Sequence, residues 1–216
     1  MSKQVAVILA GCGVFDGSEI NEVVLTLLAL EQQGVQYQCF APDIEQTHVL
    51  NHLSGDEQQQ TRNVLQEAAR IVRGNVKDIA ELDVNQFDGL IMTGGFGVAK
   101  NLSSFAFKGA ELDVLPCVSK TMKAFYGAGK IGGYMCIAPV LLPKVFEGVK
   151  CTIGHDADVA GAITSMGGEH IEAKVDQVVF DDKYKVVTTP AYMLAENIIQ
   201  AKSGIDKLVA KVCEAI

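Results

Sequence analysis

Four short segments rich in apolar residues divide the first two thirds of the chain, and none of them contains a charged residue. They span residues 5–9, 35–40, 89–92 and 131–135, and each is predicted to be a strand. The uninterrupted apolar run at 5–9 is typical of a strand that is buried on both faces of a parallel sheet. Between these segments, apolar residues recur every three or four positions, which indicates amphipathic helices. This spacing predicts helices over residues 20–30, 61–72, 114–126 and 139–146.

The first predicted helix has recognisable signals at both of its ends. Its apolar positions are Ile20, Val23, Val24, Leu27, Leu28 and Leu30. We expect Ser18 to be the N-cap, because a hydroxyl oxygen can accept a hydrogen bond from a free N–H group of the first turn. Gly34 is the expected stop, since glycine readily adopts the left-handed conformation that ends many helices.

The last third of the chain continues the alternation of strands and helices. Further strands are predicted at residues 150–153, 169–173, 178–180 and 186–188, with a hairpin turn at 181–184 and a final amphipathic helix. The pattern predicts an α/β fold of the flavodoxin-like type: a mostly parallel sheet with helices on both faces and a late β-hairpin. A length of 216 residues suits one domain, which we expect to span residues 1–216. Ligands of such sheets bind beyond the carboxyl ends of the strands.

Charge and composition narrow the range of partners. The net charge is -8, and the 18 Lys and Arg residues are scattered along the chain, so binding to nucleic acid or to anionic membranes is not expected. The apolar run at residues 5–10 is much shorter than a signal peptide core or a membrane span, and we expect a cytoplasmic protein. The six cysteines contain no CxxC pair, which argues against disulfides and zinc. His48 and His52 have no third ligand at a suitable spacing, so no metal is expected.

Cys136 is the candidate nucleophile. It follows the predicted strand at residues 131–135 and precedes Ile137, Ala138 and Pro139, where a helix is expected to start. A cysteine at such a junction resembles a nucleophile elbow, and a helix N-terminus favours the thiolate. The alternative is a buried thiol that fills a gap beneath the helix, because free cysteine is among the most buried residue types.

Three further features are expected at the same edge of the sheet. Glu19 follows the first strand, and its alternative role is to complement the helix dipole. Gly94 and Gly95 follow the third strand, where a glycine turn can bring backbone N–H groups to an oxyanion or can simply form a tight turn. His155 follows a later strand, and it is either a proton carrier or an ordinary loop histidine. No complete phosphate-binding motif occurs, so no nucleotide cofactor is expected.

Four segments of the chain resemble the ElbB family, a PfpI-like branch of the class I glutamine amidotransferase-like superfamily. The segments are residues 10–19 (AGCGVFDGSE), 93–102 (TGGFGVAKNL), 135–139 (MCIAP) and 187–195 (VTTPAYMLA). The resemblance runs over essentially the whole chain. It implies a flavodoxin-like sandwich, a homodimer, and a glyoxalase activity that turns glyoxal into glycolate without a cofactor.

The resemblance also implies a role for individual residues. The elbow cysteine of the superfamily matches Cys136, its acidic partner matches Glu19, and a histidine of some relatives matches His155. The backbone N–H groups that would hold an oxyanion belong to Gly95 and Ile137. The substrate is then a small aldehyde or a glycated adduct. Three alternatives stay open: a redox-sensing or partner-binding protein with an oxidisable Cys136, a glutamine amidotransferase subunit, and a PfpI-type peptidase.

Overall fold

A seven-stranded sheet forms the centre of the molecule. The structure is a computed structural model, and it describes residues 3–216. The strands of the sheet are β1 (Gln4–Ile8), β2 (Gln36–Ala41), β3 (Val76–Asp78), β4 (Gly89–Met92), β5 (Ile131–Met135), β8 (Val179–Asp181) and β9 (Val186–Thr189). Their spatial order is β3-β2-β1-β4-β5-β9-β8, and only β8 runs antiparallel to its neighbour. The predicted flavodoxin-like fold with a late hairpin is therefore confirmed.

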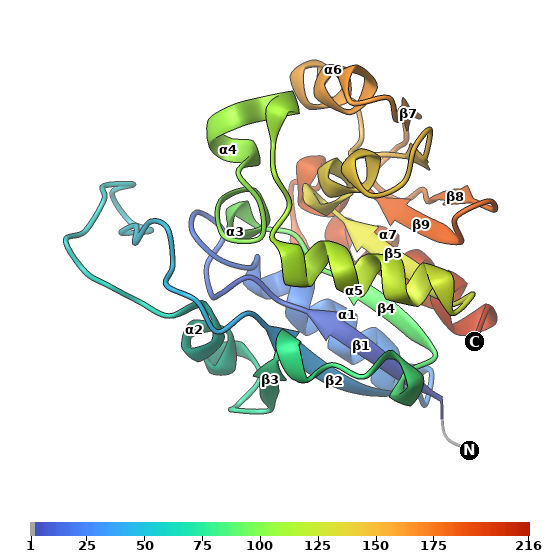
Figure 1. Cartoon of the computed structure of the whole chain (residues 1–216), viewed down its shortest axis with the longest axis horizontal. Coiled ribbons are helices and arrows are strands. Elements are labelled where there is room, and N and C mark those ends of the chain that lie inside the picture. The colour runs from blue at the N-terminus through green and yellow to red at the C-terminus, as the bar shows by residue number, and fades with distance from the viewer. Residues whose placement is uncertain (1–2) are drawn as a thin grey trace.

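Helices cover both faces of this sheet (Figure 1). The helices α1 (Ile20–Gln32) and α7 (Ile198–Glu214) pack against each other behind the sheet, and α5 (Pro116–Gly127) lies in front of it. Helix α2 (Val64–Ile71) contacts β2 and β3 near one edge. The shorter helices are α3 (Phe96–Lys100), α4 (Phe105–Lys108) and α6 (Ala157–Ser165). No helix in residues 3–216 is both long enough and apolar enough to cross a membrane.

The remaining elements are short. Five 3₁₀ helices connect the layers: η1 (Ile79–Glu81), η2 (Val84–Gln86), η3 (Gly109–Glu111), η4 (Ala138–Lys144) and η5 (Ala191–Met193). Strands β6 (Lys150–Cys151) and β7 (Glu169–His170) pair with each other in a separate two-stranded sheet. The strands predicted at 150–153 and 169–173 are therefore shorter than expected and lie outside the main sheet. The α-helix predicted at 139–146 is the 3₁₀ helix η4, because Pro143 inside it has no N–H to donate.

Helix α1 is oriented differently from its apparent apolar stripe. Its buried residues are Glu22, Val23, Leu25, Thr26, Ala29 and Leu30. Ile20, Val24 and Leu28 are 43%, 49% and 41% exposed and follow one another every four residues on the outer face. The helix is apolar on nearly all sides, so hydrophobic periodicity alone could not determine which side faces the sheet. The rotation places a glutamate, Glu22, in the interior.

The start of α1 also differs from the prediction. The N-cap is Glu19, whose carboxylate accepts a hydrogen bond from the N–H of Glu22. The Ser18 hydroxyl instead accepts a hydrogen bond from the N–H of Ala10, 2.8 Å away, and so fixes the loop after β1. Gly34 ends the helix as predicted, with a φ of 67°.

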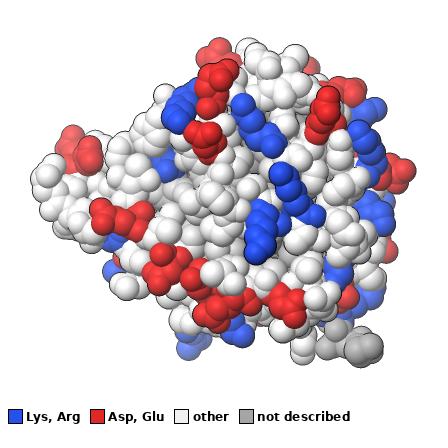
Figure 2. Space-filling model, in the orientation of Figure 1, with Lys and Arg blue, Asp and Glu red and all other residues white. Residues whose placement is uncertain are grey.

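The face that carries α5 is mostly uncharged. Figure 2 shows Lys and Arg side chains near its centre and right side, and Asp and Glu side chains mainly along its lower edge and upper margin. The interior contains one hydrophobic cluster that extends from Val5 in β1 to Val212 in α7. Every residue from Val5 to Ile8 is inaccessible to solvent, as expected for a central parallel strand.

Candidate active site

Cys136 occupies a strained turn at the carboxyl end of β5. Its φ is 58°, which lies in the left-handed region that residues other than glycine seldom adopt. The Cys136 N–H donates to the carbonyl oxygen of Thr189 on the neighbouring strand, 3.0 Å away, and this contact helps to fix the turn. The side chain is only 7% exposed. This is the geometry of a nucleophile elbow, and such strain is concentrated at functional sites.

Two backbone N–H groups point at the Cys136 sulfur. They belong to Gly95 and Ile137, and both lower the pKa of the thiol by hydrogen bonding. Gly95 has a φ of 96°, and a Cβ atom at this position would lie 2.3 Å from the carbonyl oxygen of Gly17. Only glycine can therefore bring this N–H so close to the sulfur. The pair is suitably placed to stabilise an oxyanion on a carbon atom that is bonded to the sulfur.

The carboxyl group that contacts the thiol belongs to Glu22. Glu22 is completely buried and forms a hydrogen bond with Cys136. Its Oε2 accepts from the N–H of Gly94 at 2.8 Å, and its Oε1 accepts from the N–H of Tyr192 at 3.2 Å. A Cβ at Gly94 would lie 2.7 Å from Glu22 Oε2 and 2.4 Å from the Cys136 Cβ, so this glycine makes room for the pair.

The surroundings raise the pKa of both Glu22 and the Cys136 thiol. Burial, together with the charge of Glu19, raises the pKa of Glu22 to about 7. Burial and the charge of Glu22 raise the pKa of the Cys136 thiol well above its usual value. The expected lowering of the thiol pKa by a helix N-terminus is therefore outweighed. The short 3₁₀ helix η4 is a weak source of positive potential, while the buried carboxylate is close.

Glu19 was the predicted acidic partner of the thiol, but its carboxylate caps helix α1 instead. Its Oε2 accepts from the N–H of Glu22 at 2.6 Å, and its Oε1 accepts from the side-chain amide of Asn21 at 3.3 Å. Burial raises the pKa of Glu19. Within residues 3–216, no hydrogen bond joins Glu19 to Cys136. A carboxylate at position 22, directly before the apolar pair Val23 and Val24, was the signal in the sequence that indicated the partner of the thiol.

A second strained residue closes the other side of the site. Ala191, at the start of η5, is fully buried and has a φ of 45°. It directs the N–H of Tyr192 to Glu22, and the Tyr192 hydroxyl accepts a hydrogen bond from the Asn21 amide at 3.4 Å. Sequence reasoning did not identify Tyr192, although it lies in one of the four family-like segments.

His155 lies apart from these residues. Its side chain is exposed and lines a cavity of about 520 Å³ together with Glu172, Leu194 and Gln200. In the part of the chain that the structure describes, no hydrogen bond or ion pair connects His155 with Cys136, Glu19 or Glu22. The same part of the chain contains no group of three His, Cys, Asp or Glu side chains that could hold a metal ion.

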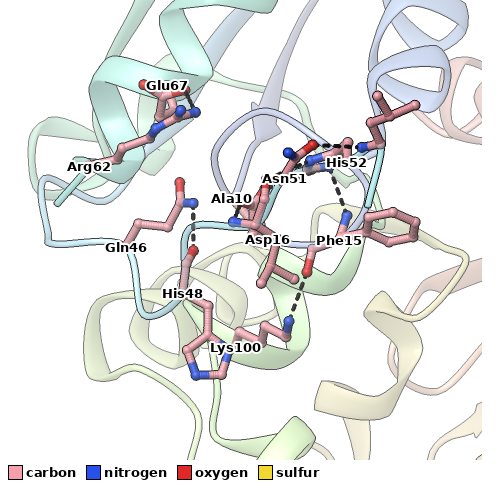
Figure 3. A network of polar contacts seen from close by, with 12 residues as sticks. Ala10, Phe15, Asp16, Gln46, His48, Asn51, His52, Arg62, Glu67 and Lys100 are labelled. Carbon is pink, nitrogen blue, oxygen red and sulfur yellow. Dashed lines mark hydrogen bonds and ion pairs between the residues drawn. The ribbon is translucent and has the colours of Figure 1, made fainter. Parts of the chain in front are cut away.

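The loop between β1 and Glu19 is held by a polar network (Figure 3). The Asp16 carboxylate, almost completely buried, accepts from the N–H of Leu50 at 2.7 Å. The His52 ring accepts from the N–H of Phe15 at 3.1 Å, and the Lys100 ammonium donates to the Phe15 carbonyl oxygen at 2.8 Å. These contacts tie the loop to the long excursion after β2 and to α3, so the segment that leads into Glu19 is fixed from two sides.

The chain is similar over its length to three curated proteins. No protein-family model matches it. It is 43% identical to the Homo sapiens glutamine amidotransferase-like class 1 domain-containing protein 3, mitochondrial, over 99% of this chain and 83% of that protein. The Rattus norvegicus ES1 protein homolog, mitochondrial, is 42% identical over 98% of this chain and 83% of that protein. The Danio rerio ES1 protein, mitochondrial, is 32% identical over 89% and 77%.

Solved structures show the same fold. The isoprenoid biosynthesis protein with amidotransferase-like domain from Ehrlichia chaffeensis is 38% identical, covers 99% of both chains and superposes with a TM-score of 0.91. Drosophila melanogaster DJ-1beta is 17% identical, covers 100% of this chain and 96% of that chain, and has a TM-score of 0.58, a similarity of fold alone.

These comparisons correct one prediction and support another at a coarser level. The expected cytoplasmic location is wrong, because the three curated relatives are all named as mitochondrial proteins. The superfamily that the sequence motifs indicated is confirmed, whereas the narrower ElbB family is not. With 43% identity over 99% of its length to the human protein, the chain belongs to the family of glutamine amidotransferase-like class 1 domain proteins.

Proposed function

We propose that this protein is a cofactor-independent glyoxalase that converts glyoxal to glycolate at Cys136. One observation carries the proposal: the Cys136 sulfur lies at a strained elbow, between two backbone N–H donors and the buried carboxyl group of Glu22. This arrangement supplies a nucleophile, an oxyanion site and a proton carrier, which together suffice for addition to an aldehyde and for proton transfer between adjacent carbons.

The first step is addition of the thiol to one aldehyde carbon of glyoxal. The Cys136 sulfur forms a bond to this carbon as its proton passes to the Glu22 carboxylate. The electron pair of the C=O bond moves to the oxygen, which is held by the N–H groups of Gly95 and Ile137. Glu22 then returns the proton to this oxygen. The product is a hemithioacetal that still carries the second aldehyde group.

The second stage moves a proton between the two carbons. The Glu22 carboxylate removes the C–H proton of the hemithioacetal carbon, and the resulting enediol is protonated on the neighbouring carbon. The product is a thioester of glycolic acid on Cys136. Water then adds to the thioester carbonyl, the C–S bond breaks, and glycolate leaves with the thiol restored. The net reaction adds one water molecule to glyoxal and involves no external oxidant or reductant.

The narrow access to the sulfur supports a small substrate. Cys136 is only 7% exposed, and Gly94 packs so closely that a Cβ there would lie 2.8 Å from the sulfur. A two-carbon dicarbonyl compound is better suited to so little exposed surface than an extended peptide is. The partner of the thiol is a carboxyl group instead of a histidine, which supports aldehyde chemistry over amide hydrolysis.

The test is the formation of glycolate from glyoxal, followed by NMR of the product. Disappearance of glyoxal is not a suitable measurement, because glyoxal also reacts with lysine, arginine and amine buffers. Cys136→Ala is expected to reduce glycolate formation to the rate without protein. Cys117→Ala, which removes a half-buried thiol elsewhere, is the matched control and should keep the wild-type rate. Equal rates for wild type and Cys136→Ala would exclude the proposal.

A redox-sensing role is the second candidate, and the same hydrogen bonds support it. A sulfinate on Cys136 would accept hydrogen bonds from Gly95 and Ile137, and protonated Glu22 could donate a further one. Two molecules of hydrogen peroxide would oxidise the thiol to the sulfinic acid and yield two molecules of water. Peptide mass mapping after peroxide treatment distinguishes the candidates: a sensor accumulates sulfinate at Cys136 but forms no glycolate.

We further propose that two copies of the chain associate through the outer face of α1. Ile20, Val24 and Leu28 form an exposed apolar stripe there, with one residue on each successive turn. Because the protein carries a net charge of -8, an uncharged face is where two copies can approach each other with little repulsion. Sedimentation at micromolar concentration tests this arrangement.

A further inference from the structure

The thiol site contains two carboxyl groups and no basic side chain. Glu19 and Glu22 lie three residues apart on the first turn of α1, and both are largely buried. None of the ion pairs formed within residues 3–216 includes either of them. The charges that act on Glu22, Cys136 and Tyr192 are those of the acidic groups themselves. Buried carboxylates are usually paired with a cation, so the composition of this site is unusual.

The Glu22 carboxyl group already has three partners. Its two oxygens accept the N–H groups of Gly94 and Tyr192, and the carboxyl group also contacts Cys136. Glu22 is also completely buried, whereas Glu19 is 9% exposed. A cation that entered the site would therefore meet Glu19 first.

Glu19 retains the capacity to accept from one more donor. Oε2 accepts from the N–H of Glu22 at 2.6 Å, and Oε1 accepts from the Asn21 side-chain amide at 3.3 Å. The backbone N–H of Asn21 is the third donor to this carboxylate, which leaves one of its four lone-pair positions. The carboxylate can therefore accept one further hydrogen bond. Asn21 and the Tyr192 hydroxyl, which are joined to each other at 3.4 Å, lie beside it. Glu19, Asn21 and Tyr192 together form what we call the acidic rim of the site.

We propose that Glu19 makes the Cys136 site selective for electrophiles that carry a positive charge, and against those that carry a carboxylate. This inference deepens the proposed function and rests on the same thiol: the preferred substrates are small α-dicarbonyl compounds that bear a protonated amine. A cation beside the thiol would provide Glu19 with its missing partner. An anion would add a third negative charge to a buried pair of carboxyl groups.

Coulomb's law gives the size of the effect. A unit charge about 6 Å from Glu19, at an effective dielectric constant between that of a protein surface and that of water, changes the rate by roughly tenfold. The change has opposite signs for a cation and for an anion. The ratio of their rates is therefore a more sensitive measurement than either rate alone.

The experiment uses three methanethiosulfonate reagents that react with thiols without any further chemistry. They carry a trimethylammonioethyl group, a sulfonatoethyl group or a methyl group. In each case the Cys136 sulfur forms a disulfide with the reagent, the S–SO₂ bond breaks, and methanesulfinate leaves with the electron pair. Peptide mass mapping gives the rate at Cys136 separately from the other five cysteines. Each rate is divided by that of 2-mercaptoethanol, which removes the intrinsic reactivity of the reagent.

In the wild type, the corrected ratio of cationic to anionic rates is expected to be about 100-fold, because a tenfold gain for the cation and a tenfold loss for the anion multiply. Glu19→Gln should lower this ratio by about 100-fold, while the oxygen of glutamine can still accept the N–H of Glu22 and cap the helix. Asn21→Lys leaves the cap unchanged, places a cation beside Glu19 and should lower the ratio as well. The matched control is Glu31→Gln, which removes the same charge at the exposed end of α1 and should leave the ratio unchanged.

A wild-type ratio near one would overturn the inference, as would equal ratios in wild type and in a folded Glu19→Gln or Asn21→Lys variant. These rates do not depend on the turnover of glyoxal. Selective labelling without glycolate formation would therefore refute the proposed activity and leave the selectivity standing. Glycolate formation with an unselective thiol would refute the selectivity alone.

Discussion

Replacing Glu22 with glutamine is expected to change how the stability of the protein depends on pH. Glu22 is completely buried, and its pKa of about 7 lies well above the 4.5 of an exposed glutamate. In the folded protein the carboxyl group therefore holds its proton over a range of pH in which the unfolded chain has lost it. Glutamine has nearly the same shape and cannot titrate, so the comparison isolates this one proton.

The sign and the magnitude follow from linkage. A pKa that is raised by folding contributes stability below the unfolded pKa, and this contribution disappears as the pH rises through the folded pKa. The difference between 4.5 and about 7, at 1.36 kcal/mol for each pH unit, corresponds to about 3 kcal/mol. The free energy of unfolding of the wild type, relative to Glu22→Gln, should therefore fall by about 3 kcal/mol between pH 4 and pH 8.

The assay is urea denaturation of both proteins at each pH unit from 4 to 8. Glutamine can accept only one of the two N–H groups that Glu22 accepts, from Gly94 and from Tyr192. That loss shifts the whole curve by a constant and does not affect its slope with pH. Glu31→Gln shows the change produced by removing one exposed charge from the same helix. A difference between wild type and Glu22→Gln that stays constant from pH 4 to pH 8 would refute the assignment of a raised pKa to Glu22.

Three further substitutions, the first with a matched control, test the geometry of the site and of the surface. Gly94→Ala places a Cβ 2.4 Å from that of Cys136 and should lower kcat/KM for glyoxal by about 100-fold. The control is Gly127→Ala, which should be neutral because nothing lies within 4 Å of the added Cβ. Both are measured by steady-state glycolate formation, and equal rates for the two variants would contradict the close packing at Gly94. His155→Ala should change the same kcat/KM by less than about twofold, because His155 lines a separate cavity and, in the described part of the chain, has no hydrogen bond or ion pair with the thiol. A positioned proton carrier contributes far more than twofold, so a loss of tenfold or greater would show that His155 takes part in the reaction. Val24→Glu should convert a dimer into a monomer in sedimentation experiments, because it places a charge in the middle of the exposed stripe on α1; an unchanged dimer would locate the interface elsewhere.

The sequence by itself was sufficient to determine the class of fold. Uncharged apolar runs marked β1, β4 and β5, because a strand in the centre of a parallel sheet is buried on both faces and tolerates no charge. The segment at 35–40 marked β2 although it contains two glutamines, and the short strand β3 was not predicted. The parallel sheet in turn brings the loops after these strands to one edge, so the glycine turn at Gly95 and the residue after Cys136 could be expected near the same point. Local pattern and chain topology decide these features, and both can be read along the sequence.

The identity of the carboxyl group beside the thiol was decided only by the tertiary structure. Helix α1 is apolar on almost every side, so its pattern does not show which face packs on the sheet. The packing of α1 against α7 turns Glu22 inward and leaves Glu19 as the N-cap. The shift of the thiol pKa likewise depends on burial and on the distance to Glu22. The position of His155 depends on where the chain runs after β6, at the side of the main sheet. Each of these is set by contacts between segments far apart in the chain, which residue spacing does not encode.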